Sequence, residues 1–358
     1  MEGDLFPHPD DPVGGSLVAV PHPFAAPIET MEARVRASWP EQPDWAYEPK
    51  WDGFRAVSWS DPVRLDSRNQ KPLLRYFPEL APALEQLPDG TVVDGEVVVV
   101  LADGLDFDAL SQRIHPAASR VNLLAESTPA QLVAFDLLAV DGSDLRDRPF
   151  GERRERLEEV LDRLDHPWNL TPSTSDLEVA KDWFRSFEAA GCDGIVAKRL
   201  EGPYVGGKRE MLKIKHRRTV DCVVGGYREH KDGGKIGSIL LGLYAGSGEL
   251  HFIGHCSGFS DHDRVAILEQ LAEIRSEDSF GEEVRRPGGE SRWSGGKDLS
   301  WVPVEPGVVV EVSYDQLTGG RFRHATRFER WRPDKDPDQC AMDQLVRPEG
   351  PGFDEVVS

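Results

Sequence analysis

Apolar runs separated by turns dominate the pattern of the chain up to residue 215. The run at 97–101 is too apolar to have an exposed face, so it predicts a strand buried on both sides. Helical spacing is clearest at 153–164 and at 176–190, and the second helix should end at Gly191, a residue favoured just after a helix. Strands are also expected at 46–48, 54–59, 63–66, 91–101, 131–140, 195–198 and 211–215, and helices at 29–38 and 78–87. This mixture predicts an α+β domain.

Short strands and glycine-rich turns replace this pattern from residue 220 onward. Strands are expected at 220–227, 238–244, 250–254 and 308–314, with one helix at 261–274. These elements predict a small Greek-key barrel of the OB type. The chain should therefore divide into an extended N-terminal arm at 1–27, a first domain at 28–217 and an all-β barrel domain at 218–358. A glycine-rich loop at 288–298 is expected to be mobile.

Composition indicates a globular protein. Of its 358 residues 39% are hydrophobic and 29% are charged, and this length favours two domains. No run approaches the roughly 20 apolar residues of a membrane helix, and the first residues show no secretion signal, so we expect a cytoplasmic protein without a membrane partner. The four cysteines form no Cys-x-x-Cys pair, which disfavours both a disulfide framework and a zinc ribbon. His251, His255 and Cys256 lack a second ligand pair, so a metal site there is not favoured.

The net charge of −21 argues at first against a nucleic-acid partner. Binding to nucleic acid depends, however, on where the positive charge lies. Lysine and arginine are concentrated at 208–218 and again at 321–335, where they interleave with aromatic residues. The alternative interpretation is a solvated charged face, the commoner origin of such runs. Two basic segments in so acidic a chain weaken that alternative.

Lys50 stands in the segment Glu48-Pro-Lys-Trp-Asp-Gly-Phe-Arg. Lys-x-Asp-Gly alone is weak evidence. Further segments follow in order: Ser67-Arg68-Asn69, Asp94-Gly95-Glu96, Phe135-Asp136, 193–198, 211–215 and 327–335. Together they closely resemble the ordered motifs of the covalent nucleotidyltransferase superfamily of ATP-dependent DNA ligases, RNA ligases and mRNA capping enzymes. With 76–80 and 223–227, they are most similar to the small bacterial ATP-dependent DNA ligases of the stand-alone ligase C type.

The resemblance implies a nucleotidyltransferase (adenylation) domain followed by an OB barrel, and a reaction in three steps. Lys50 would attack the α-phosphate of ATP, AMP would pass to the 5′-phosphate at a nick in double-stranded DNA, and the 3′-hydroxyl would displace AMP. The barrel would swing between two poses, hinged near 219–221. The implied partners are ATP and nicked DNA, with a repair polymerase or an end-binding protein as a further candidate. We expect a monomer that works in DNA repair at the nucleoid.

The resemblance also gives each candidate residue a role. Lys213 and Lys215, on one face of a strand, would neutralise phosphates and, with Mg²⁺, lower the pKa of Lys50. The expected Mg²⁺ ligands are Glu96 and Asp193, and Mn²⁺ could replace Mg²⁺. Asp193 is one methylene shorter than the usual glutamate, so a water-mediated contact is an alternative. The other nucleotide contacts would be Glu48 at the base edge, Arg55 and Arg68 at ribose or phosphate, Phe135 stacked on adenine, Lys198, and Arg327 and Lys335 over the β- and γ-phosphates.

Alternatives stay open at several positions. Phe135 is otherwise a core residue, Asp94 a turn residue, and at least one of Arg330 and Arg332 structural. Gln70 stands where many relatives have glycine, which leaves the geometry of that turn open. The rival functions are an RNA ligase, a GTP-using capping enzyme, and a non-catalytic DNA-binding protein of the OB type.

Overall fold

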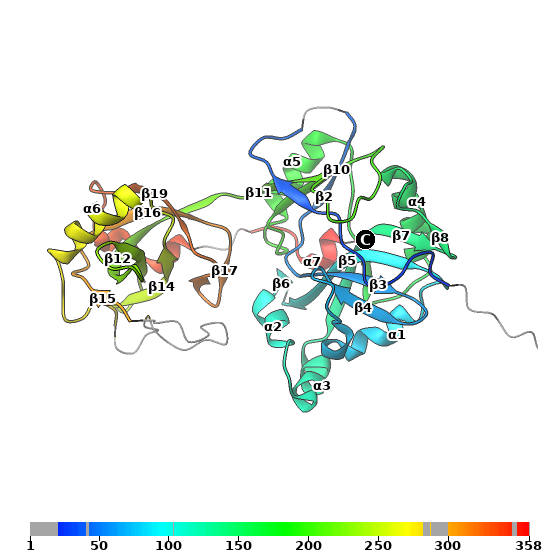
Figure 1. The fold of residues 1–358 in the computed structure, drawn as a ribbon, viewed down its shortest axis with the longest axis horizontal. Helices are drawn as coiled ribbons and strands as arrows, with labels where there is room; N and C mark the ends of the chain where they lie inside the picture. The colour runs from blue at the N-terminus through cyan, green and yellow to red at the C-terminus, as the bar shows by residue number, and fades with distance from the viewer. Residues whose placement is uncertain are drawn as a thin grey trace, which may run out of the picture.

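The structure is a computed structural model that describes residues 21–40, 43–102, 104–281, 287, 300–345 and 349–357. Two units follow one another along the chain (Figure 1). The first contains two sheets with helices around them, and the second is a small barrel-like sheet. This architecture confirms the expected α+β fold with an all-β second part. In the described residues no helix combines the length and apolar character needed to cross a membrane.

The larger sheet of the first unit is built around the apolar runs identified in the sequence. It consists of β4 (Arg64–Ser67), β3 (Phe54–Trp59), β5 (Val92–Leu101), β7 (Ala130–Val140) and β8 (Ser143–Asp144), with β6 (Gly104–Leu105) beside β5 and β9 (Trp168–Leu170) beside β7. Val93, Val97 and Leu132 are fully buried, and they pack with Leu84 of α1 and Leu157 of α4. The surrounding helices are α1 (Ala81–Leu84), α2 (Phe107–Gln112), α3 (Ala118–Ser127) and α4 (Phe150–Leu161).

The smaller sheet has four strands in the order β1, β11, β10, β2. These are β1 (Ala33–Val35), β11 (Met211–Lys215), β10 (Gly194–Arg199) and β2 (Trp45–Pro49), and α5 (Leu177–Ser186) packs on them. The helix expected at 29–38 is wrong. Its central residues pair instead, in parallel, with Met211 to Lys213. Backbone groups of this segment form hydrogen bonds with the edge of β11. Such tertiary pairing outweighs a weak helical preference.

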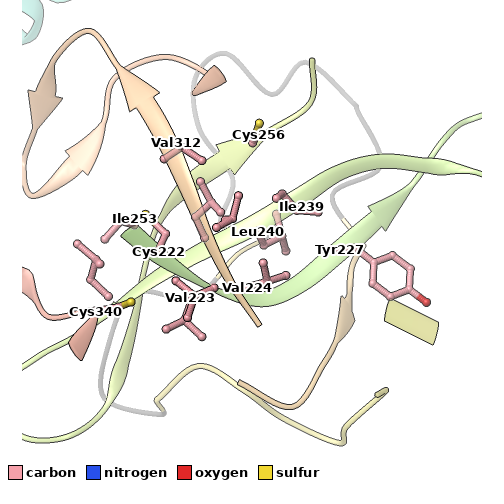
Figure 2. Packing of buried hydrophobic residues seen from close by; sticks show 14 of the residues in the cluster. Cys222, Val223, Val224, Tyr227, Ile239, Leu240, Ile253, Cys256, Val312 and Cys340 are labelled. Carbon is pink, nitrogen blue, oxygen red and sulfur yellow. The ribbon is translucent and has the colours of Figure 1, made fainter. Parts of the chain in front are cut away.

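The second unit is a six-stranded sheet in the order β14, β13, β12, β16, β19, with β15 beside β12. Its elements are β12 (Arg218–Glu229), β13 (Ile236–Tyr244), β14 (Leu250–Cys256), α6 (Asp261–Ala272), β15 (Val302–Pro303), β16 (Val309–Tyr314), the hairpin β17 (Leu317–Thr318) and β18 (Arg321–Phe322), and β19 (Arg327–Trp331). Figure 2 shows the core, in which Val224, Leu240, Ile253 and Val312 are buried among three cysteines. The loop expected at 288–298 lies outside the described residues.

The first connection between the units is short, because β11 ends at Lys215 and β12 begins at Arg218. The hinge expected near 219–221 falls inside a strand. Those residues pair with β16 through Ser313, Val312 and Glu311, so bending there would break the sheet of the second unit. Residues 216–217, which lie between β11 and β12, are therefore the better candidate for the joint.

The C-terminal residues return to the first unit. The last helix, α7 (Phe353–Val356), buries Phe353 and Val356 against residues of the first unit. The sequence pattern groups the whole of 218–358 with the barrel, so this contact was not expected. Phe24 and Ile28 also pack on the first unit, which agrees with an N-terminal arm that lies along it.

Candidate active site

A cavity of about 230 Å³ lies between the two sheets of the first unit. Its walls gather candidates from both sheets: Glu48, Lys50, Lys198, Lys213 and Lys215 from the smaller sheet and its ends, and Arg55, Arg68, Glu96 and Phe135 from the larger one. Segments up to 167 positions apart, Glu48 and Lys215, thus meet at one site. Asp193 contacts this group through Lys50. Arg327 and Lys335 do not line the cavity.

Lys50 follows β2 directly, and its backbone is fixed on both sides. Its N–H donates to Gly194 at 2.9 Å, and its carbonyl accepts from the N–H of Asp193 at 3.0 Å. Its Nζ lies 2.8 Å from Asp193 Oδ1, while Asp193 Oδ2 lies 3.2 Å from Lys215 Nζ. Burial alone would lower the pKa of Lys50, but the carboxylates of Asp193, Glu96 and Asp52 together outweigh it and the pKa is raised. In this arrangement Lys50 is therefore held as an ammonium. The lowered pKa was expected for the site with Mg²⁺ bound, and it stays a prediction.

Arg55 is held in place by a buried carboxylate. Its Nε and Nη2 donate to Asp94 at 3.0 and 2.6 Å, and Asp94 is fully buried. The Tyr204 hydroxyl donates to Asp94 at 2.6 Å and accepts from the Met31 N–H at 3.0 Å. Asp94 is thus neither a turn residue nor free to bind a metal. Sequence reasoning missed Tyr204, because no local pattern marks a contact across 110 positions.

Replacing Asp94 with alanine should destabilise the protein strongly. It leaves the partly buried Arg55 guanidinium without its carboxylate, and breaking a buried pair on one side costs about 3 kcal/mol or more. Urea unfolding followed by fluorescence measures the change in the free energy of unfolding. The control is Glu159→Ala, which removes an exposed pair with Arg156 on α4 and should change little. A loss below about 1 kcal/mol for Asp94→Ala would contradict this role.

Glu48 lines the cavity, and one oxygen of its carboxylate accepts no hydrogen bond from the described residues. The residue is only 2% exposed, and its Oε2 lies 2.8 Å from Lys198 Nζ, which also donates to the carbonyl of Phe135 at 2.6 Å. Within the described residues Oε1 accepts no hydrogen bond, although Arg154 Nη1 lies 3.7 Å away. Burial raises the pKa of Glu48, and Lys198 and Arg154 offset this only in part.

Phe135 lies between two cations at the cavity. Lys198 Nζ is 4.8 Å and Arg55 Cζ is 5.3 Å from its ring centroid. The residue is half-buried and lines the cavity, so the alternative of a plain core residue does not hold. Such a ring at the cavity wall offers a stacking surface, with two cations over the ring.

Glu96 fits an open metal site rather than a closed one. Its Oε1 accepts the Gly53 N–H at 3.1 Å, and burial raises its pKa to about 8 despite Lys50 and Arg55. Burial disfavours the charged form of Glu96, and a cation that arrives with phosphates would stabilise that form. Mg²⁺ often takes only one or two protein carboxylates. In the described residues no group of three or more His, Cys, Asp or Glu is placed to hold a metal ion. Asp193 is already paired with Lys50 and Lys215.

Arg68 is exposed at the mouth of the cavity, where Nε donates to Glu32 at 2.6 Å. Glu32 also lines the cavity and was missed in the sequence, because the segment around it was expected to be helical. Gln70, in the turn after Arg68, has φ of 59°. That left-handed conformation is the one glycine adopts without strain, and a glutamine can still adopt it at some cost.

The basic segment 327–335 lies on the barrel, away from the cavity (Figure 1, β19). Arg332 Nη1 donates to Asp221 at 2.8 Å, and its Nε donates to Asp334 at 3.0 Å, so Arg332 is structural in this arrangement. Lys335 Nζ lies 3.4 Å from the same Asp221. Arg330 pairs with Glu311.

A different part of the barrel contacts the first unit. Arg323 Nη1 lies 2.8 Å from both carboxylate oxygens of Asp52, and its guanidinium covers the ring of Phe107 at 3.1 Å. Lys215 Nζ also lies 3.2 Å from Asp315. A second cavity of about 410 Å³ separates the units beside these contacts. The hairpin end of the barrel, and not β19, therefore faces Lys50.

Comparison with known proteins agrees with this geometry. The description "ATP dependent DNA ligase domain" matches residues 24–215, and "ATP dependent DNA ligase C terminal region" matches residues 232–335. DNA ligase C1 of Mycolicibacterium smegmatis is 48% identical over 340 residues, covering 91% of this chain and 96% of the relative. DNA ligase C of Mycobacterium tuberculosis is 46% identical over 353 residues, covering 94% and 98%.

Among solved structures, one titled for the minimal DNA-binding scaffold of Lig E DNA ligases has a TM-score of 0.55 at 16% identity, covering 84% of this chain and 99% of that one. This likeness shows the shared fold. The sequence matches favour the DNA ligase interpretation over the RNA ligase, capping-enzyme and non-catalytic alternatives. From the two matched regions and the relatives of nearly equal length, the chain belongs to the ATP-dependent DNA ligases, and within them to the ligase C type.

Proposed function

We propose that Lys50 is the residue that carries AMP while this DNA ligase seals a nick. The observation that carries the proposal is the cavity in which Lys50 meets three further lysines, Lys198, Lys213 and Lys215, and the buried carboxylate of Glu48. A triphosphate needs such a concentration of positive charge, and few other uses would justify burying it. The covalent step divides the sealing reaction into successive phosphoryl-type transfers, each of which takes place at Lys50 or in the site around it.

The first transfer forms a bond between Lys50 Nζ and the α-phosphorus of ATP, and the bond to the β-phosphate breaks to release pyrophosphate. Lys50 must first lose a proton, and Asp193 Oδ1, 2.8 Å away, is placed to receive it. Entry of the nucleotide would bring Lys213 and Lys215 onto its phosphates, which lessens their pull on Asp193. Burial and the neighbouring cations Lys50 and Lys215 already lower the pKa of Lys213.

AMP then passes to the 5′-phosphate of the nick, which forms a pyrophosphate linkage and frees Lys50. The 3′-hydroxyl next attacks that phosphate and displaces AMP, so one phosphodiester forms for each ATP cleaved. Arg68, exposed at the mouth of the cavity, is suited to bind the incoming 5′-phosphate once it leaves Glu32. Positioning and charge neutralisation supply most of the catalysis in such phosphoryl transfers.

Glu96 would hold Mg²⁺, or Mn²⁺ in its place, together with phosphate oxygens and water. Asp193 would bind the ion directly only after releasing Lys50, and otherwise through a water molecule. When bound, the ion would neutralise charge that develops on the phosphates. The raised pKa of Glu96 supports this role, because a nearby cation would offset the effect of burial and stabilise the charged carboxylate.

Glu48 would select adenine. Its unpaired Oε1 can accept the exocyclic amino group of adenine, with Phe135 as the stacking surface and Lys198 holding the other oxygen. Guanine presents a carbonyl oxygen at the corresponding position, so two acceptors would face each other. An unsatisfied buried acceptor costs about 1–3 kcal/mol, which corresponds to roughly 10- to 100-fold in selectivity.

Glu48→Gln should therefore lower the preference for ATP over GTP by at least about tenfold, because the amide can turn its NH₂ toward a carbonyl. The measurement is the ratio of the self-labelling rates, divided by the half-saturating concentrations, for the two nucleotides. Tyr47→Phe is the matched control on the same strand, since that hydroxyl points away to the carbonyl of Pro40. An unchanged ratio in the Glu48 variant would exclude the role in base selection.

The overall proposal is tested with ATP labelled in the α-phosphate. The wild-type chain should retain label through a bond that acid cleaves and base does not, and should release it on addition of nicked DNA. Absence of retained label would overturn the proposal. We further expect the protein to act as a monomer at the nucleoid in DNA repair, with a repair polymerase or an end-binding protein nearby. Comparison of nicks, gaps and double-strand ends as substrates tests that expectation.

A further inference from the structure

We propose that the C-terminal tail, residues 349–357, is a positioning element for Lys50. The tail follows the barrel in the chain but packs on the first unit, behind the residue next to Lys50. Its role would be to fix Trp51, and through Trp51 the course of the chain that presents Lys50 to the nucleotide. This inference rests on the proposed role of Lys50.

The central contact is between two aromatic rings. Phe353 of α7 and Trp51 lie with ring centroids 5.5 Å apart in an edge-to-face arrangement, and their exposed fractions are 1% and 4%. Trp51 is held from a second direction, because its Nε1 donates to Thr171 Oγ1 at 2.8 Å. Trp51 also lines the nucleotide cavity. A residue that lines the cavity thus has its side chain packed on the tail.

The tail also packs on the larger sheet, beside the part of β5 and β7 that carries Glu96 and Phe135. Val98 and Val133 belong to the same buried cluster as Phe353. Each lies two residues from a site residue on its strand, Val98 from Glu96 on β5 and Val133 from Phe135 on β7. Because alternate residues of a strand point to one face, the tail packs on the same face of β5 from which Glu96 projects. Phe135 lies at a register shift in the pairing of β5 and β7, and it lines the same cavity as Glu96.

Two further contacts fix the tail close to Asp193. Cys192, the neighbour of Asp193, is in the cluster with Phe353. At the start of the tail, a Cβ added to Gly350 would lie 2.3 Å from the carbonyl oxygen of Ser186, so only glycine allows this close approach to α5. The tail is therefore fitted at both ends to the wall that holds the ion pair of Lys50 and Asp193.

The size of the expected effect follows from geometry. Removal of the Phe353 ring leaves space behind Trp51, into which the Trp51 ring can move. Displacements near 1 Å can cost up to about 100-fold in rate when a nucleophile must be aligned. Since the Lys50 backbone keeps its hydrogen bonds to residues 193 and 194, we expect a smaller effect, about tenfold.

The test uses full-length Phe353→Ala at a temperature where the protein remains folded. At saturating ATP the single-turnover rate of AMP attachment should fall about tenfold, while the half-saturating ATP concentration changes less than about threefold. Sealing of a nick that already carries AMP should change by less than about threefold, because Lys50 is not the nucleophile in that step. Phe353→Leu, which refills most of the space, should recover most of the rate.

The control for a purely structural role is Leu84→Ala. Leu84 is a fully buried residue of α1 in another core cluster, and its replacement should lower the free energy of unfolding by a similar amount. The inference would be overturned if Leu84→Ala slowed AMP attachment as much as Phe353→Ala. It would also be overturned if Phe353→Ala changed only the half-saturating ATP concentration, or did not slow attachment at all. If Phe353→Ala does not fold, Val356→Ala tests the same cluster and should slow attachment by about threefold. A wild-type chain that takes no AMP would instead overturn the proposed function.

Discussion

Replacement of Lys50 by arginine should abolish AMP attachment while leaving the protein folded. Arginine keeps the positive charge and can keep the ion pair with Asp193, whereas alanine leaves that buried carboxylate without its 2.8 Å partner. A guanidinium stays protonated at any pH the protein tolerates, so it has no free electron pair for phosphorus. The variant thus separates the charge of Lys50 from its nucleophilicity.

We expect attachment by Lys50→Arg and Lys50→Ala to fall below roughly one ten-thousandth of the wild-type rate, as loss of a covalent nucleophile does elsewhere. The measurement is retention of labelled AMP after denaturation, with a pre-adenylated nick as the second substrate. Both variants should still seal that nick, more slowly, because its AMP is already in place. Label retained on either variant would show that another residue is the nucleophile.

Loss of the Lys335 ammonium should slow AMP attachment by about 100-fold and sealing of a pre-adenylated nick by less than about threefold. Lys335 would bind the leaving phosphates only in the first step, after the barrel has turned β19 toward the cavity. In the structure Lys335 instead pairs with Asp221. Because Arg332 also pairs with Asp221, Lys335→Ala does not leave that carboxylate alone.

Arg327→Ala should behave in the same way as Lys335→Ala. The control for the loss of a surface cation is Arg156→Ala, which removes an exposed pair on α4 and should alter neither rate. Both steps are followed by single-turnover kinetics with the same enzyme preparation. Equal losses in the two steps would count against a role confined to the first.

Much of the site could be predicted from the sequence because phosphate chemistry restricts which residues serve. Recognisable segments of the sequence contain Lys50, Glu96, Phe135, Lys198 and Lys213, and their order was enough to predict that they share one site. In the structure all five line one cavity. The strands that carry them are apolar runs, which sequence patterns indicate well. The pKa of Lys50 was not predictable, since its direction depends on how close Asp193 lies.

Other features escaped prediction for identifiable reasons. The strand β1 has three residues, too few for any period, and it forms only because β11 offers it an edge. Tyr204 supports Asp94 from a distant segment without a motif of its own. The tail carries an ordinary sequence, and only its packing in the structure, against Trp51 and its neighbours, connects it with the first unit.

The return of the tail gives the chain a second covalent path between the units. From Leu345, which packs on the barrel core, to Glu349 the chain reaches at most about 14 Å when fully extended. A barrel held by two connections can turn less freely than one held by a single connection. A large displacement of the barrel from the first unit would require the tail to leave Trp51.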